Sequence, residues 1–248
     1  MDKRIHIVPV GYDYYSRVVE PLLDPSADKI FFIRHEKGAI RGHDKFFNSI
    51  TREIKKIDIK YDEIETDIWD LFQCVEIFRK IIQDEVKKEN HVYINVSTGT
   101  KVTAMAGILA CMMWNQTPYY VKLKNPTKKS IKTIPKIAVE EAERLPTFDI
   151  KKPDYKTMKI LEKIASYKDE MLRKWQLTDY LVNEKIIRPT NPKKTFTVNA
   201  KLAQLQNMIL PMEKEWEFVE SEHRGSRSQV KITKKGKQAL KIFGIPEP

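Results

Sequence analysis

Residues 91–114 read HVYINVSTGTKVTAMAGILACMMW, and this segment decides the fold of the front of the chain. The apolar run 91–96 predicts a buried strand, and the nearly unbroken apolar run 102–114 is long enough for a helix. Between them lies a tight turn rich in Ser, Thr and Gly, residues 97–101. The first N–H groups of a helix have no intrahelical partner, and the helix dipole favours an anion there. The turn is therefore either a phosphate site or, more simply, a Ser97 or Thr98 cap with Lys101 in solvent.

Neither of the two common nucleotide-binding motifs is present. The spacings G-x-x-x-x-G-K-[ST] and G-x-G-x-x-G are both absent from the turn. A ligand-binding role rests on residue types instead. Gly99 lets the backbone approach a ligand, Ser97, Thr98 and Thr100 supply hydroxyl groups, and Lys101 supplies a positive charge.

Strands and helices alternate along the first half of the chain. Apolar, β-branched runs predict five strands, at residues 4–10, 29–34, 57–64, 91–96 and 118–123. Helical spacing predicts four helices, at residues 15–22, 46–56, 68–88 and 100–114. Asp67 is the expected N-cap of the third helix, and Trp69 is expected in the core. The alternation predicts an α/β fold: a Rossmann-like, doubly wound, mostly parallel sheet with strand order 3-2-1-4-5.

In such a sheet, ligands bind beyond the carboxyl ends of the strands, where the strand order reverses. That place lies between the first and fourth strands. The first strand ends at Gly11-Tyr12-Asp13, so this loop is expected beside the turn at 97–101. Asp13 is expected to cap the next helix, and Tyr15 to pack in the core. Arg17 either reaches a phosphate or pairs with Glu20.

The pattern changes near residue 150. Residues 131–139 predict an additional strand at the sheet edge because Pro135 removes a donor. Beyond it we expect three helices, a strand pair and a last helix, at residues 158–165, 175–182, 199–210, 216–222, 229–233 and 235–243. Pro211 should end the third of these helices. This order is typical of a winged helix-turn-helix. The expected domains are a ligand-sensing domain at 1–145, a linker at 146–154 and a winged helix domain at 155–248.

Charge is distributed unevenly along the chain. The composition, 41% apolar and 32% charged, is that of a globular protein, and the net charge is +11. Residues 1–150 carry 24 Lys and Arg against 22 Asp and Glu, whereas residues 151–248 carry 21 against 12. The basic second half indicates either binding to a polyanion such as double-stranded DNA or a lysine-rich surface that serves solubility.

Specific side chains of the second half are candidates for DNA contact. The helix 199–210 is the expected recognition helix, with Leu202, Leu205 and Ile209 facing inward. Its amide and basic side chains would meet base edges. The hairpin would contact phosphates. The DNA-binding candidates are Asn199, Lys201, Gln204, Asn207, Arg224, Arg227, Lys231, Lys234 and Lys235.

No sequence feature indicates a metal site, a cofactor or a membrane. Cys74 and Cys111 each lie in an apolar helical pattern, so they predict neither a metal cluster nor a disulfide framework. There is no signal-peptide pattern and no apolar stretch long enough to cross a bilayer. We therefore expect a cytoplasmic protein without a cofactor.

Two motifs resemble the CARF family, the CRISPR-associated Rossmann-fold sensors of cyclic oligoadenylates. They are IVPVGYDYYSRVVEPL at residues 7–22 and NVSTGTK at residues 95–101. With the winged helix, nearly the whole chain is similar to the CARF transcription regulators of archaea. The resemblance implies a homodimer formed through the Rossmann domains, with cyclic tetra-adenylate bound across its two-fold axis. The ligand-binding candidates are Gly11, Tyr12, Asp13, Arg17, Ser97, Thr98, Gly99, Thr100 and Lys101, with Tyr12, Tyr14 or Tyr15 available to stack on adenine.

Three functional hypotheses follow. The first is a CRISPR-linked, DNA-binding transcription regulator that senses cyclic oligoadenylate. The second is a metal-independent ring nuclease, in which Lys101, Ser97 and Thr98 position a ribose 2′-hydroxyl and stabilise charge. The third is a ligand-gated adaptor whose winged helix binds a protein partner.

Overall fold

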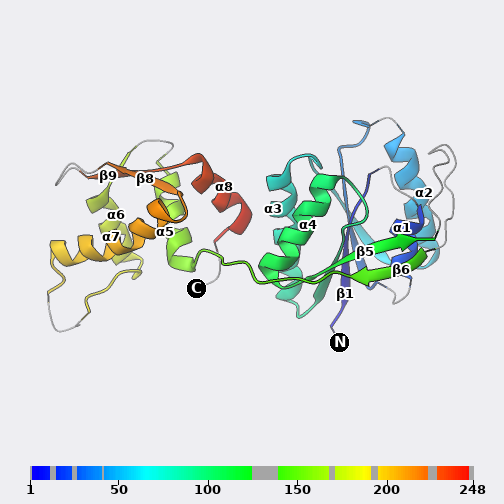
Figure 1. The fold of residues 1–248 in the computed structure, drawn as a ribbon, viewed down its shortest axis with the longest axis horizontal. Helices are drawn as coiled ribbons and strands as arrows, with labels where there is room; N and C mark the ends of the chain where they lie inside the picture. Colours follow the sequence, from blue (N-terminus) through cyan, green and yellow to red (C-terminus); the bar gives the residue numbers. More distant parts are fainter. Residues whose placement is uncertain are drawn as a thin grey trace. The chain divides into compact units, whose positions relative to one another are not determined.

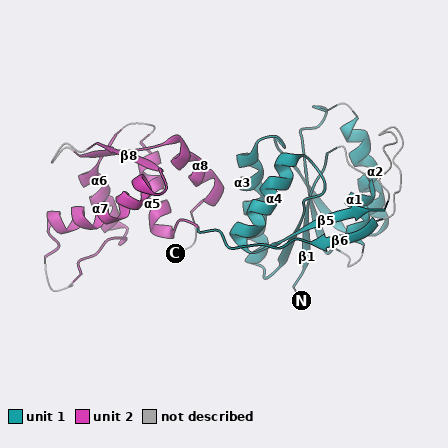
Figure 2. Cartoon of the chain, viewed as in Figure 1, with its two compact units in different colours: residues 1–151 teal, residues 152–248 magenta. Residues whose placement is uncertain are grey.

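The computed structural model describes residues 2–11, 15–23, 27–40, 42–124, 139–167, 171–190, 195–222 and 228–245. The chain divides into two compact units, Met1–Lys151 and Lys152–Pro248 (Figure 2).

The first unit is built on a six-stranded sheet with the order β3-β2-β1-β4-β5-β6 (Figure 1). Five strands are parallel: β1 (Arg4–Pro9), β2 (Lys29–Arg34), β3 (Lys60–Glu65), β4 (His91–Asn95) and β5 (Thr117–Leu123). The last strand, β6 (Val139–Arg144), pairs antiparallel with β5. The predicted order 3-2-1-4-5 is confirmed. The strand predicted at residues 131–139 lies outside the described residues except for Val139, where β6 begins.

Helices cover both faces of this sheet. They are α1 (Tyr15–Val19), the 3-10 helix η1 (Glu20–Leu22), α2 (His43–Lys56), α3 (Leu71–Val86) and α4 (Lys101–Trp114). Figure 1 shows α3 and α4 side by side on one face, with α1 and α2 on the other. The central strands β1 and β2 are buried from their second residue onward because helices lie on both sides of them.

The start of α3 differs from the prediction. Asp70 is the N-cap, because its Oδ1 accepts hydrogen bonds from the N–H groups of Phe72 (2.8 Å) and Gln73 (3.1 Å). Asp67 instead accepts from the N–H of Trp69 (2.9 Å), in the turn that precedes the helix. Trp69 therefore lies outside the helix and is 55% exposed, so its predicted place in the core was wrong.

The second unit has the element order of a winged helix. Its helices are α5 (Tyr155–Ala165), α6 (Lys174–Asn183), α7 (Val198–Lys214) and α8 (Lys234–Phe243). A small antiparallel sheet has the order β7-β9-β8, formed by Leu172–Arg173, Gln229–Ile232 and Val219–Glu222. The predicted three helices and hairpin are confirmed, and the short β7 was not predicted.

Pro211 lies inside α7 and does not end it, contrary to the prediction. Its missing N–H removes one helical hydrogen bond. The Pro211 carbonyl accepts from the N–H groups of Glu215 (2.9 Å) and Trp216 (3.1 Å), and Met212 is buried in the core of the unit beside Leu205 and Ile209.

His6 makes the stability of the first unit depend on pH. Its side chain is buried on β1, stacked on Tyr93 with ring centroids 5.2 Å apart, and its Nδ1 lies 3.2 Å from the Tyr119 hydroxyl. The pKa of His6 is lowered to about 4, mainly by burial. The positive charge of Arg4 also lowers this pKa, and the Asp28 carboxylate opposes the shift. The unfolded chain binds this proton near pH 6.5, so the folded state is disfavoured as pH falls from 6.5 to 4.

We expect the free energy of unfolding to fall by about 2 kcal/mol between pH 7 and pH 5 through His6 alone. His6→Phe, which keeps a ring between the two tyrosines, should remove this part of the dependence. Burial also lowers the pKa values of His43 and His91, so a smaller slope should remain. Urea unfolding of both proteins at the two pH values measures the difference. Equal losses of stability would contradict the assignment to His6.

Candidate functional site

The loops after β1 and β4 touch through their backbones. A Cβ atom on Gly11 would lie 2.9 Å from the carbonyl oxygen of Gly99. Gly99 has a φ of +80°, and a Cβ there would lie 2.4 Å from Thr103 Oγ1 and 2.7 Å from Pro9 Cβ. Both positions therefore require glycine. The prediction that these two loops lie beside each other, where the strand order reverses, is confirmed.

Asn95, the last residue of β4, joins the turn to α1. Its side chain is fully buried, and its Nδ2 donates to the carbonyl of Arg17 at 2.9 Å. Its Oδ1 accepts from both the N–H (3.0 Å) and the hydroxyl (2.5 Å) of Ser97. The Ser97 hydroxyl therefore donates its proton to Asn95, while its oxygen can still accept a hydrogen bond. The motif included Asn95, but the sequence assigned it no separate role.

Thr100 caps α4, in place of the Ser97 or Thr98 cap that was considered. Its Oγ1 accepts from Thr103 N–H (3.1 Å), and Thr103 Oγ1 accepts from Thr100 N–H (2.8 Å). This is a reciprocal capping arrangement. The Thr100 hydroxyl also donates to the carbonyl of Ile68 at 2.8 Å, which ties the turn to the segment before α3.

Two groups of the turn have unmet bonding capacity. Thr98 is 2% exposed, and its hydroxyl has no hydrogen-bond partner among the described residues. An unsatisfied buried polar group is costly, so a ligand atom that bonded this hydroxyl would be stabilised. Lys101 is exposed and forms no ion pair with any described residue. It lies at the positive end of the α4 dipole, whose first turn has no acidic residue. This uncompensated positive charge favours a bound anion.

Arg17 contacts Tyr120 on β5. Its Nη2 lies 3.3 Å from the Tyr120 hydroxyl, and its guanidinium carbon lies 5.5 Å from the centre of that ring. Glu20, considered as its partner, accepts from the N–H of Val139 at 3.1 Å. Tyr15 is 8% exposed, as its predicted core position requires. Tyr12, Asp13 and Tyr14 lie outside the described residues.

Two buried side chains that the sequence did not single out lie near the ends of β1 and β2. His43, at the start of α2, donates from Nε2 to the carbonyl of Val10 at 2.9 Å, and burial lowers its pKa. Arg34, at the end of β2, is 3% exposed and forms an ion pair with Asp44. Asp44 also accepts from the N–H of Gly38 at 2.9 Å. The only signal for Arg34 was its place directly after the apolar run 30–33, and no signal pointed to His43.

The recognition-helix candidates on α7 separate into two groups. Asn199 and Asn207 are exposed. Gln204 donates from Nε2 to the carbonyl of Arg188 at 2.8 Å, and Lys201 is half-buried with its Nζ 5.8 Å from the centre of the Phe196 ring. Asn199 and Asn207 are thus the more exposed of the four candidates on α7.

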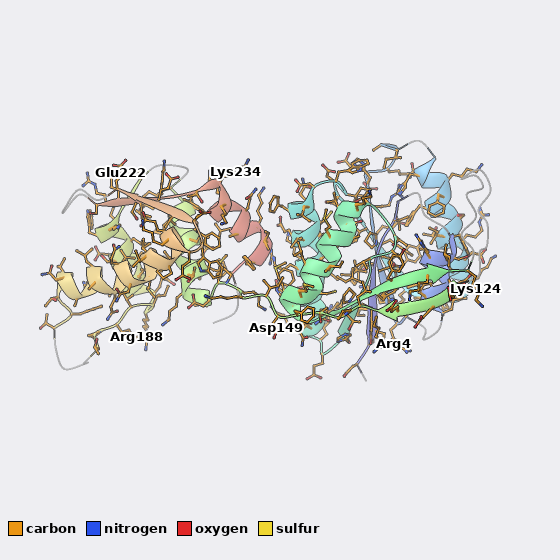
Figure 3. The ribbon with its side chains drawn as sticks, viewed as in Figure 1. Arg4, Lys124, Asp149, Arg188, Glu222 and Lys234 are labelled. Atoms are coloured by element: carbon orange, nitrogen blue, oxygen red, sulfur yellow. The ribbon has the colours of Figure 1, made fainter. Side chains whose placement is uncertain are left out.

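The predicted wing cations also differ in their surroundings. Lys231 pairs with Glu220 at 3.1 Å and Lys235 with Glu217 at 2.9 Å, whereas Lys234 is exposed without an ion-pair partner in the described part of the chain. Arg224 and Arg227 lie outside the described residues. Figure 3 shows Lys234 and Glu222 on one side of the second unit and Arg188 on the other.

Lys174 is a buried cation that the sequence did not reveal. It is 5% exposed at the start of α6, and its Nζ donates to Gln206 Oε1 on α7 at 3.1 Å. Burial lowers its pKa, against the opposing effect of Glu213. This contact sets the position of α7 against α6.

The described residues contain no helix long and apolar enough to span a bilayer. Within the same residues, no three His, Cys, Asp or Glu side chains form a group that would hold a metal ion.

Two family models match the chain. Residues 4–125 match the model HFX_2341_N:-like, N-terminal, and residues 156–244 match the DUF6293 C-terminal winged helix domain. A relative from Methanocaldococcus jannaschii, protein MJ1513, is 31% identical over 125 residues, which is 47% of this chain and 37% of that protein. The chain therefore combines an N-terminal domain like that of the first model with a winged helix domain.

Several solved structures are similar over most of the chain. Can2 from Sulfobacillus thermosulfidooxidans, in complex with cyclic tetra-adenylate, has a TM-score of 0.42 and 11% identity, over 97% of this chain and 64% of Can2. Csm6 from Enterococcus italicus, bound to cyclic hexa-2′-fluoro-hexa-dAMP, has a TM-score of 0.42 and 13% identity, over 87% of this chain and 56% of Csm6. VC1899 from Vibrio cholerae has a TM-score of 0.40 and 11% identity, over 96% of this chain and 64% of VC1899. The alignments thus cover less than two thirds of each of these proteins.

Proposed function

We propose that this protein is a transcription regulator, linked to CRISPR defence, that senses cyclic oligoadenylate. The observation that carries the proposal is the site at the ends of β1 and β4. There, the loops that meet at Gly11 and Gly99 bring together the capped N-terminus of α4, the exposed Lys101 and the Thr98 hydroxyl, which has no hydrogen-bond partner in the described part of the chain. The two sequence motifs that resemble the CARF family lie at this same site.

The chemistry of the site suits phosphate. A helix N-terminus, a lysine at its first position and a buried hydroxyl group all stabilise a phosphate oxygen. A ligand with several phosphates in a symmetric ring would meet two copies of these groups if two protomers joined at this site. Cyclic tetra-adenylate has this symmetry, and it is the ligand that we propose.

The surface of α4 supports a homodimer. Val102, Met105, Leu109 and Met112 are spaced three and four residues apart, and all four remain at least partly exposed, Met105 by 50%. Lys101 is the only charged residue of the helix. A helix that is apolar on all sides is normally buried on all sides. We propose that this stripe packs against its symmetry mate, which brings both Lys101 residues to the ligand.

The second unit provides the proposed output. It matches a winged helix domain and carries most of the net positive charge of the chain. In winged helix proteins the third helix enters the major groove and the hairpin lies against the backbone. Asn207 on the exposed surface of α7 is the best-placed candidate to contact a base, because Gln204 is held by the Arg188 carbonyl.

The contribution of each DNA contact should depend on its position. Arg224→Ala combined with Arg227→Ala should lower affinity for a selected binding site and for random duplex by similar factors, and should reduce the log–log salt slope by about one unit per lost contact. Asn207→Ala should remove roughly 1–3 kcal/mol of preference for the selected site and leave random-duplex binding unchanged. Fluorescence anisotropy at several salt concentrations measures both effects, with Lys60→Ala in the first unit as the control.

A protein partner is the alternative that this experiment excludes or supports. If the arginine pair has no effect on DNA while cyclic tetra-adenylate still binds, the winged helix serves an adaptor function. Partner binding that is insensitive to salt would lead to the same conclusion, because phosphate contacts weaken steeply with salt.

The shared position of Thr98 and Lys101 in one turn also favours a second candidate, a ring nuclease. In that reaction a ribose 2′-oxygen forms a bond to phosphorus as the bond to the 5′-oxygen breaks, and the 2′-hydroxyl proton is transferred to the leaving oxygen. Lys101 would stabilise the phosphate charge and Thr98 would orient it. Incubating the protein with cyclic tetra-adenylate separates the two functions, because a sensor returns the ring intact whereas a nuclease yields linear products.

A further inference from the structure

Trp69 is a large aromatic side chain that the fold leaves open to solvent. It is 55% exposed, in the turn between β3 and α3, and that turn is held in place by the hydrogen bond from its own N–H to Asp67. Its ring lies beside that of His35, with centroids 4.7 Å apart and planes inclined at 52°. His35 directly follows the last residue of β2. Tryptophan is largely buried in most proteins, whereas Trp69 is exposed next to a second aromatic ring, and the pair offers a flat surface to a ligand.

The aromatic pair and the proposed phosphate site share one edge of the sheet. Since β1 to β5 are parallel, their carboxyl ends all lie at this edge. The hydrogen bond from the Thr100 hydroxyl to the Ile68 carbonyl joins the two turns directly. Trp69 and Lys101 are the residues that immediately follow these two partners, so they lie on adjacent segments.

We propose that Trp69, together with His35, stacks on a nucleobase of the ligand whose phosphate binds at residues 97–101. The inference rests on the proposed function and identifies the groups that recognise the base. Indole and imidazole rings present flat π faces to a base, and such stacking does not depend on charge. The buried Nδ1 of His35 has no hydrogen-bond partner among the described residues, so a polar atom is available to a base or ribose.

The surroundings of Trp69 favour an uncharged part of a nucleotide over other occupants. Glu65 and Asp67, four and two residues before Trp69 in the chain, are exposed, and these carboxylates would repel a phosphate. They also prevent a contiguous apolar patch of the kind that docks a protein. The phosphate is therefore expected on the Lys101 side and the base on the Trp69 side.

Trp175 provides a matched control for Trp69. It is 48% exposed but belongs to α6 in the winged helix domain. Binding of cyclic tetra-adenylate should quench tryptophan fluorescence in the wild type and in Trp175→Phe. Trp69→Phe should lose most of that change, although calorimetry should still detect binding. Trp69→Ala should weaken binding by roughly 5- to 150-fold, with melting temperature unchanged because the side chain is exposed.

The outcomes distinguish this inference from the proposed function. Wild-type affinity and wild-type quenching in the Trp69 variants, with binding still lost in Lys101→Ala, would overturn the stacking role alone. A wild-type protein that does not bind cyclic tetra-adenylate would overturn both.

Discussion

Replacing Lys101 with alanine should weaken the binding of cyclic tetra-adenylate by roughly 1.5–3 kcal/mol for each copy of the site, because each copy loses a hydrogen bond between two charged groups. In a dimer both copies contribute, so the total loss should exceed a factor of about 100. Isothermal titration calorimetry measures it. Lys60→Ala is the matched control, because Lys60 is also exposed but begins β3, at the opposite end of the parallel sheet.

The same substitution should not destabilise the unliganded protein. Lys101 is exposed and has no ion-pair partner among the described residues, and it lies at the positive end of the α4 dipole. Removing an unfavourable charge from that end should leave the stability unchanged or raise it by about 0.3–1 kcal/mol. A variant that melts at the wild-type temperature and binds as tightly as the wild type would contradict the phosphate site. Loss of binding with a large loss of stability would point to misfolding instead.

Met105→Glu should convert the proposed dimer to a monomer. Met105 is the most exposed residue of the apolar stripe on α4, and two glutamates at a symmetric contact would be buried together and repel each other. Light scattering at micromolar concentration should give the dimer mass for the wild type and the monomer mass for the variant. Ligand affinity should fall with it, because Lys101 and Met105 lie on the same helix and the ring needs both copies of the site.

Two controls define the dimer experiment. Met105→Leu conserves volume and apolar character, so it should remain dimeric. Val86→Glu places the same charge on another exposed apolar position, at the end of α3, and should leave the dimer intact. A wild-type protein of monomer mass, or a Met105→Glu variant that keeps the dimer mass, would refute α4 as the interface.

The strand order and the place of the candidate site followed from the sequence because both depend on local patterns. Apolar runs alternating with helical spacing define a parallel sheet, and connection rules leave few orders for its strands. Gly11 was identified as the end of the first strand and Gly99 as a position where the backbone could approach a ligand, and the structure shows that both positions require glycine because the two loops meet there.

The boundaries of the helices were predicted less accurately from the sequence, because neighbouring residues compete for the same role. Asp67 and Asp70 are both good N-cap residues three positions apart, and the sequence does not state which one the helix uses. The choice of Asp70 moved Trp69 from the expected core to the surface. Pro211 was expected to end α7, but the helix continues through it to Lys214, with the adjacent Met212 buried in the core.

The sequence by itself thus determined the α/β class, the strand order 3-2-1-4-5, the winged helix and the contact between the loops at residues 11 and 99. Only the tertiary structure decided which polar groups are satisfied. Asn95 bonds Arg17 and Ser97, Lys174 bonds Gln206, and Thr98 is left without a partner among the described residues. Periodicity and turn chemistry act between residues close in the chain. The partner of a buried donor or acceptor, by contrast, is set by segments far apart in sequence that packing brings together.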